Sequence, residues 1–127
     1  MKIEKDINDW GIEMKKSYRV KDHKEFQDII YSGKSFANRE LVIYYKEKVT
    51  QRHFRIGISV GKKIGNAVQR NKIKRHLREA FHFLEDQIKP TVDIIIIARK
   101  PAIHMNTSEM VRSVSHLLKK QRLFSNR

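Results

Sequence analysis

The chain has 127 residues, enough for one domain with a single modest core. Its 28 Lys and Arg residues against 14 Asp and Glu residues leave a net charge of +14, which favours a polyanionic partner. It has no cysteine, which excludes disulfides and thiolate metal sites, and no apolar run near the ~18 residues that span a bilayer. The N-terminus shows no apolar core of the signal-peptide type, so we expect a cytoplasmic protein with no membrane partner.

The N-terminal part of the chain predicts an extension followed by a short helix. We expect residues 1–13 to be a disordered extension and residues 14–127 to form a single domain. Asp22, with Glu25 three residues later, is typical of a capped helix start. Gly33 predicts the end of this helix.

Three segments have the composition of β-strands. Residues 41–45 are an apolar and aromatic run. Residues 53–61 alternate strictly between apolar and other side chains, which indicates a half-buried strand. Residues 46–52 between these runs suit a hairpin loop. Residues 92–98 are an almost uninterrupted isoleucine run, which predicts a central strand buried on both faces.

The longest predicted helix begins at Asn66. The Asn66 side chain can accept from the Gln69 backbone N–H, and Gln69 can reach back in a capping box. Proline disfavours helical geometry in the residue before it, so we expect the helix to end at Lys89-Pro90. Its apolar stripe, which we expect to face the core, consists of Ile73, Leu77, Ala80, Phe81, Leu84 and Ile88.

A final helix begins near Asn106 and ends in a basic tail at Lys119, Lys120 and Arg122. The order of elements predicts an α/β (α+β) fold. We expect a two-layer sandwich in which three helices pack against a mixed sheet of about four strands.

The positive charge is concentrated in one stretch. Residues 48–78 contain ten Lys and Arg residues and no Asp or Glu. A solvated helix face normally interleaves Glu with Lys at four-residue spacing, and here only Arg75 with Glu79 does so. Cations near the positive end of a helix dipole are unfavourable unless an anion binds. We therefore interpret this helix as a nucleic-acid contact surface, with a solvated face as the alternative. Two parallel ridges carry it: Arg70, Lys74 and Arg78, and beside them Asn71 and Arg75.

This stretch closely resembles a known family. Residues 67–79, Ala-Val-Gln-Arg-Asn-Lys-Ile-Lys-Arg-His-Leu-Arg-Glu, with the Lys-Lys-Ile-Gly-Asn-Ala approach at 62–67, resemble the bacterial ribonuclease P protein component. Three other blocks resemble the same family in the same order: residues 25–27, residues 37–39 leading into 41–44, and residues 93–102. The resemblance runs from about residue 18 to about residue 118.

The resemblance implies a fold, a function and partners. The fold would be like the second domain of ribosomal protein S5, with a left-handed βαβ crossover around the basic helix. The function would be that of an RNA-binding subunit of a ribonucleoprotein endonuclease, which removes the 5′ leader from precursor tRNA. The partners would be an RNA subunit, which performs the hydrolysis with its own Mg²⁺, and precursor tRNA. No obligate protein partner is implied.

The resemblance also implies two sets of contact residues. The RNA subunit would contact Lys62, Lys63, Asn66, Arg70, Asn71, Lys72, Lys74, Arg75 and Arg78. A cleft between the first helix and the sheet would bind the leader through Phe26, Ile30, Asn38, Arg39 and Tyr44. Ile30 stands where the family commonly has a second aromatic, and Gly61 where it often has Ser. From the residues alone, Phe26 and Tyr44 suit either base stacking or ordinary packing.

The sequence disfavours catalysis by the protein itself. The basic stretch contains no carboxylate that could hold a catalytic metal, and its nearest acids are Glu47 and Glu79. His76 and His82 lie roughly 120° apart around a helix, so they do not converge, and we expect both at the surface. We expect no catalytic residue and no metal ligand. The alternative function is a non-catalytic RNA-binding module of the ribosome or RNA-assembly type with the same fold.

Overall fold

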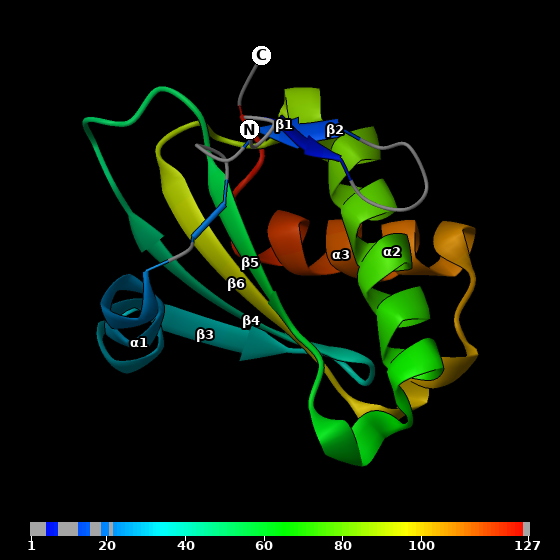
Figure 1. Cartoon of the computed structure of the whole chain (residues 1–127). Coiled ribbons are helices and arrows are strands. Elements are labelled where there is room, and N and C mark those ends of the chain that lie inside the picture. The colour runs from blue at the N-terminus through cyan, green and yellow to red at the C-terminus, as the bar shows by residue number, and fades with distance from the viewer. Residues whose placement is uncertain (1–4, 8–12, 16–18, 21, 126–127) are drawn as a thin grey trace.

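The structure, a computed structural model drawn in Figure 1, describes residues 5–7, 13–15, 19–20 and 22–125. Near the N-terminus, β1 (Lys5–Ile7) and β2 (Glu13–Lys15) pair antiparallel as a small separate sheet. Most of the expected extension, residues 1–13, lies outside the described residues.

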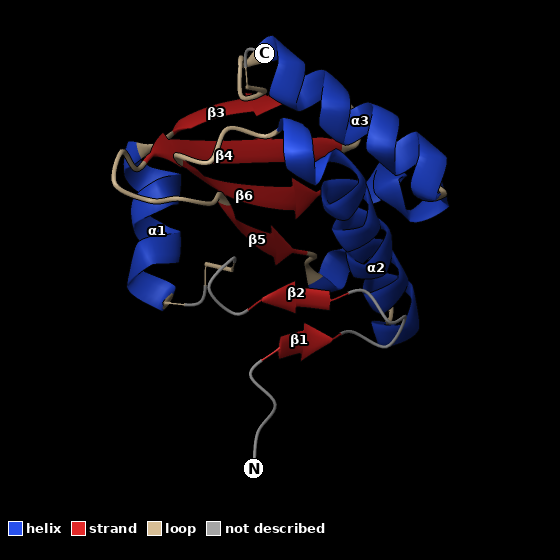
Figure 2. Cartoon of the chain, turned by 90° about the horizontal axis from the view of Figure 1, so that it is seen from above, coloured by secondary structure: helices blue, strands red, loops and turns tan. Residues whose placement is uncertain are grey.

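The main sheet has four strands and is mixed, as predicted. Its strands are β3 (Lys34–Ala37), β4 (Leu41–Glu47), β5 (Arg55–Ser59) and β6 (Val92–Ala98). They lie side by side in the order β3-β4-β6-β5, which Figure 2 shows from above. β4 is antiparallel to both β3 and β6, whereas β5 and β6 are parallel and are joined through a helix.

The expected hairpin at residues 46–52 is wrong, because β4 and β5 are not neighbours. β6 lies between them and pairs with both. A strand that is apolar on both faces is most stable in the middle of a sheet, where both of its backbone edges are also paired. The 46–52 segment instead crosses the start of β6, where the Gln51 side chain donates to the Val92 carbonyl oxygen at 3.0 Å.

Three helices cover the sheet: α1 (His23–Ser32), α2 (Ala67–Leu84) and α3 (Thr107–Lys120). The predicted caps at Asp22 and Asn66 are present, and Asn106, where a helix start was predicted, also forms a capping box. α1 packs on one face of the sheet, and α2 and α3 pack on the other (Figures 1 and 2). No helix in the described part of the chain is long and apolar enough to cross a membrane.

α2 ends earlier than the sequence predicted. It stops at Leu84 and is followed by a 3₁₀ turn, η3 (Glu85–Gln87), rather than running to Lys89-Pro90. Ile88 adopts extended geometry and forms an isolated bridge with Phe124, which keeps its side chain buried. Pro90 restricts Lys89 to extended geometry, and the chain must also turn here to enter β6. The six predicted stripe residues are nevertheless all buried.

The central strand β6 separates two apolar clusters. The larger one fills the space between the sheet and α2 with α3. The smaller one lies under α1, where the buried residues Val20, Ile29 and Ile95 pack with the half-buried Phe26 and Tyr44. The predicted burial of β6 on both faces is therefore confirmed.

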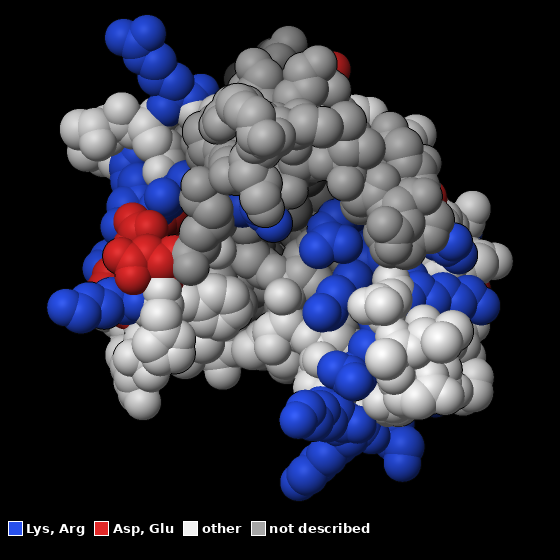
Figure 3. All heavy atoms as spheres, in the orientation of Figure 1, with Lys and Arg blue, Asp and Glu red and all other residues white. Residues whose placement is uncertain are grey.

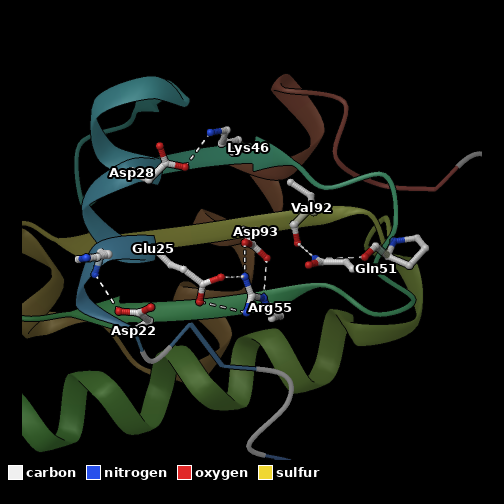
Figure 4. A network of polar contacts seen from close by, with 10 residues as sticks. Asp22, Glu25, Asp28, Lys46, Gln51, Arg55, Val92 and Asp93 are labelled. Atoms are coloured by element: carbon white, nitrogen blue, oxygen red, sulfur yellow. Dashed lines mark hydrogen bonds and ion pairs between the residues drawn. The ribbon is translucent and has the colours of Figure 1, made fainter.

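A buried ion pair attaches α1 to the sheet (Figure 4). Arg55 on β5 donates from Nε and Nη2 to the Asp93 carboxylate on β6, at 2.9 and 2.6 Å. The same guanidinium donates to the Glu25 carboxylate on α1 at 3.3 and 3.0 Å. The Asp93 side chain is fully buried, and its hydrogen bonds are the main cause that raises the pKa of Arg55 above its ordinary value. Three elements thus share one charge cluster.

A second, more exposed pair supports the same helix. Lys46 Nζ on β4 lies 2.7 Å from Asp28 Oδ2 on α1 and donates to the Ser32 hydroxyl oxygen at 3.0 Å. The hydrogen bond from Lys46 lowers the pKa of Asp28. Because both side chains are partly exposed, water screens this pair, and it contributes less to stability than the buried one.

We expect Asp93→Ala to lower the free energy of unfolding by roughly 3–5 kcal/mol, because the change leaves Arg55 without its buried partner. Urea titration measures this loss. Asp28→Ala is the matched control, since it removes a carboxylate from an exposed pair that water screens, so its loss should be clearly smaller. Equal losses for the two variants would contradict a dominant role of the Asp93 pair.

Candidate nucleic-acid interface

The cationic surface starts in a turn that is fixed to α2. η2 (Lys62–Ile64) leads through Gly65 to Asn66, whose side chain accepts from the Gln69 N–H at 2.9 Å. The Gln69 side chain accepts in return from the Asn66 N–H at 2.9 Å. A Cβ at position 65 would overlap the Gln69 side-chain oxygen, so glycine there lets the capping box close. The turn and the helix therefore present their cations as one unit.

None of the residues predicted to contact the RNA subunit is buried. Their neighbours on the same helix, Ile73, Leu77 and Phe81, face the core, which leaves the cations on the flanks and outer side of α2. The exposed members are Lys62, Lys63, Asn66, Asn71 and Lys72. The half-buried members, at the border of the apolar stripe, are Arg70, Lys74, Arg75 and Arg78.

Several of these cations have no counter-charge among the described residues. In the described part of the chain, the side chains of Lys62, Lys63, Lys72 and Lys74 form neither ion pairs nor hydrogen bonds. Arg70 Nε donates to the Gly65 carbonyl oxygen at 3.2 Å, which holds its guanidinium beside the turn without neutralising it. Such a surface repels itself until an anion binds, which suits a phosphate backbone.

Figure 3 shows how the charges are distributed over this face. Lys and Arg side chains gather along α2 and at the lower end of the molecule, where η2 lies in Figure 1. The Asp and Glu side chains visible in the same view cluster beside α1. Few acidic side chains are therefore visible beside the cations of η2 and α2 in this view, as the charge run in the sequence predicts.

A cleft of about 310 Å³ lies at the β5 edge, between α1 and α2. Phe26 of α1 forms one part of its wall and Arg78 of α2 another. Ile56, Gly57 and Ile58 on β5 also line it, together with Arg19 and Val20. The aromatic position predicted for the leader and the last cation of the predicted RNA-subunit set thus meet at one cleft.

Gly57 sets the position of the Phe26 ring. A Cβ at position 57 would lie 2.9 Å from Phe26 Cε2 and 2.8 Å from Ile95 Cδ1, closer than side chains tolerate. The missing side chain therefore lets the ring lie against β5. Sequence reasoning did not identify Gly57, although an isolated glycine within an alternating strand is a known signal for close approach.

The other residues predicted to bind the leader do not all lie near Phe26. Tyr44 is half-buried and packs into the same small cluster as Phe26, and Ile30 is half-buried one helical turn from Phe26. Asn38 instead belongs to the α3 side, where its amide donates to Ser113 Oγ at 2.8 Å and its oxygen accepts from the Leu41 N–H at 2.8 Å.

Arg39 is exposed and lies apart from the Phe26 cleft. It lines a separate cavity of about 520 Å³, together with Lys100 and His104 of η4 (Lys100–His104). The structure therefore packs Phe26 and Tyr44 into one cluster and separates Asn38 and Arg39 from them, while Ile30 lies one helical turn from Phe26 on α1.

The prediction that His76 lies at the surface is wrong. Only 9% of His76 is exposed, and its Nδ1 lies 2.6 Å from Thr107 Oγ1 on α3. The Thr107 hydroxyl in turn donates to Glu79 Oε1 at 2.6 Å. His76 is buried because α3 covers this flank of α2, which the periodicity of α2 alone does not reveal. His82 is exposed, as predicted.

The described residues contain no group of three or more His, Asp or Glu side chains placed to hold a metal ion. The one buried histidine is occupied in a helix–helix contact, and the buried carboxylate Asp93 is paired with Arg55.

Comparison with known sequences matches this chain to a family. The ribonuclease P family model matches residues 14–122. A ribonuclease P protein component from Oceanobacillus iheyensis is 62% identical over 113 residues, which cover 89% of this chain and 93% of that protein. One from Listeria monocytogenes is 52% identical over 114 residues, covering 90% of this chain and 96% of that protein.

Solved structures give the same result. The RNase P protein from Staphylococcus aureus is 47% identical to this chain, with a TM-score of 0.79. The alignment covers 87% of this chain and 100% of the Staphylococcus aureus chain. The RNase P protein from Thermotoga maritima is 30% identical, with a TM-score of 0.73, and covers 80% of this chain and 96% of that one. The fold, the cationic helix and these matches agree, and the chain belongs to the ribonuclease P protein family.

Proposed function

We propose that this chain is the RNA-binding protein subunit of ribonuclease P and assists an RNA subunit in removing the 5′ leader from precursor tRNA. The observation that carries the proposal is the cationic surface of η2 and α2. Four of its lysines have no counter-charge within the described part of the chain, and the surface ends beside the Phe26 cleft. The relatives named above are protein components of the same enzyme.

The η2 and α2 surface is proposed to bind the RNA subunit. Lys and Arg side chains contact phosphates and release counterions, which fixes the position of the protein without reading sequence. Asn66 is occupied in the capping box, so its contribution is to hold the turn, whereas Asn71 is exposed and supplies an amide for phosphate, 2′-OH or base edges.

The Phe26 cleft is proposed to bind the leader. A half-buried aromatic ring with a guanidinium across the cleft suits a single strand, in which a base stacks and the adjoining phosphate meets a cation. Tyr44 packs in the same cluster as the ring, and Ile30 lies one helical turn from Phe26 on α1. Asn38 is saturated by hydrogen bonds within the fold, and Arg39 faces another cavity, so both would meet RNA outside this cleft.

Mg²⁺ is proposed to act in the RNA subunit rather than on protein ligands. The protein contributes positive charge that screens the phosphates of two RNAs as they approach each other. The alternative, a ribosomal or assembly-type RNA-binding module, is not favoured, because the family match spans nearly the whole domain.

Reconstitution tests the proposal. We expect the purified protein alone not to cleave precursor tRNA, and we expect it to restore cleavage when added to the RNA subunit at low Mg²⁺. The RNA subunit alone at the same Mg²⁺ concentration is the control, and gel analysis of the released leader is the measurement. Cleavage by a nuclease-free preparation of protein alone would refute the division of labour.

The cationic surface has its own test. We expect the double variant Lys72→Ala, Lys74→Ala to weaken binding of the RNA subunit and to reduce the salt dependence of log K by about two, one for each lost phosphate contact. Lys34→Ala with Arg112→Ala is the matched control, since both are exposed cations on other elements. A slope that falls equally in both double variants would mean that only net charge matters.

The cleft is tested with two RNAs. We expect Phe26→Ala to weaken binding of precursor tRNA to the reconstituted enzyme by roughly 1–3 kcal/mol per stacked base, and to leave mature tRNA unaffected. Gly57→Ala should act in the same direction, because its Cβ displaces the ring. Tyr31→Ala is the control, since Tyr31 is 84% exposed on the same helix. An equal loss of affinity for precursor and mature tRNA would mean that Phe26 only packs within the fold.

A further inference from the structure

Besides the cationic surface of η2 and α2, the molecule has a basic groove at its opposite end. Its volume is about 890 Å³, and its lining includes Lys89, Thr91, Lys119, Arg122, Phe124 and Ser125; we name it the C-terminal groove. η2 follows the end of β5, whereas residues 89–91 precede the start of the parallel strand β6. The two basic regions are therefore separated by the length of the sheet, on the order of 20 Å.

The backbone at Arg122 is unusual for an arginine. It has a φ of 58°, the only positive φ among the described residues other than glycines. Arg122 N–H donates to the Lys119 carbonyl oxygen at 3.1 Å, and Leu123 N–H donates to the Leu118 carbonyl oxygen at 2.9 Å. This is the Schellman pattern that ends α3, with Arg122 at the position where glycine is strongly preferred.

Folding alone does not explain why an arginine occupies this strained backbone position. A glycine would make the same backbone bonds without the steric cost of a Cβ. Leu123 is buried and supplies the apolar contact that completes the motif, so the turn does not need the arginine side chain. The arginine is instead exposed and lines the groove.

The charges in the groove favour an anionic ligand. Lys89 is paired with Glu47 at 3.1 Å, whereas the side chains of Lys119 and Arg122 form no ion pair in the described part of the chain. Attraction to the negative end of the α3 dipole accounts for a cation in the last helical turn, such as Lys119. It does not account for an arginine beyond that turn in a strained conformation.

We propose that the C-terminal groove is a second RNA-binding site, which takes a stretch of sugar–phosphate backbone. Lys119 and Arg122 would contact phosphates, and the Thr91 and Ser125 hydroxyls line the same groove and offer hydrogen bonds to phosphate or 2′-OH. The half-buried Phe124 adds an apolar wall suited to a sugar or a base. The proposal rests on the proposed function only in taking RNA as the partner.

The decisive variant is Arg122→Gly, because folding and binding should change in opposite directions. We expect its melting temperature to rise by roughly 2–5 °C. We expect the salt dependence of log K for RNA to fall by about one, and by about two when Lys119→Ala is added. Arg122→Lys, which keeps both the charge and the strain, should retain the wild-type slope.

Arg112→Ala is the matched control, since Arg112 is an exposed arginine on α3 outside the groove, and its slope should stay at the wild-type value. Titrating the isolated RNA subunit and precursor tRNA in separate arms identifies which RNA occupies the groove. A higher melting temperature with unchanged affinity and slope for both RNAs would overturn the proposal. The Lys72, Lys74 double variant, measured in parallel, separates failure of the groove from failure of the α2 surface.

Discussion

The geometry of the candidate interface depends on one buried ion pair. Asp93 sits in the central strand with no access to water, so its carboxylate requires a permanent partner, and Arg55 supplies it from the neighbouring strand. The same guanidinium holds Glu25, which fixes α1 against the sheet. Phe26 follows Glu25 directly and lies over Gly57. A charge pair in the core thus positions an aromatic ring in a cleft at the surface.

α2 serves stability and binding with separate faces. Its apolar stripe is buried against the sheet and α3, and its capping box satisfies the backbone at its first turn. The cations on its other faces add little to folding and repel one another, yet the buried stripe holds them in place. Because Arg78 lines the Phe26 cleft, the surface proposed to bind the RNA subunit is continuous with the cleft proposed to bind the leader. This arrangement suits a protein that brings two RNAs together.

Local patterns in the sequence predicted local structure well. The caps at Asp22 and Asn66, the helix start near Asn106 and the buried stripe of α2 follow from residues a few positions apart, and the structure has them all. The predictions of strand order and of the exposure of His76 failed because both features depend on residues that are distant in sequence. The order of strands is set by the two-sided burial of β6, and the burial of His76 is set by Thr107 on α3. Three further contacts also join separate elements and could not be predicted from local patterns. They are the Arg55–Asp93 ion pair, the packing of Phe26 on Gly57 and the hydrogen bond from Asn38 to Ser113.

We propose that two neighbouring surfaces of this one small domain bind two different RNAs. Site-directed photo-crosslinking in the reconstituted complex tests it most directly, with a photoreactive side chain placed either at position 26 or at position 72. The account predicts that position 26 crosslinks to leader nucleotides of precursor tRNA and that position 72 crosslinks to the RNA subunit. Crosslinks from both positions to the same RNA, or from position 26 to the RNA subunit alone, would contradict it.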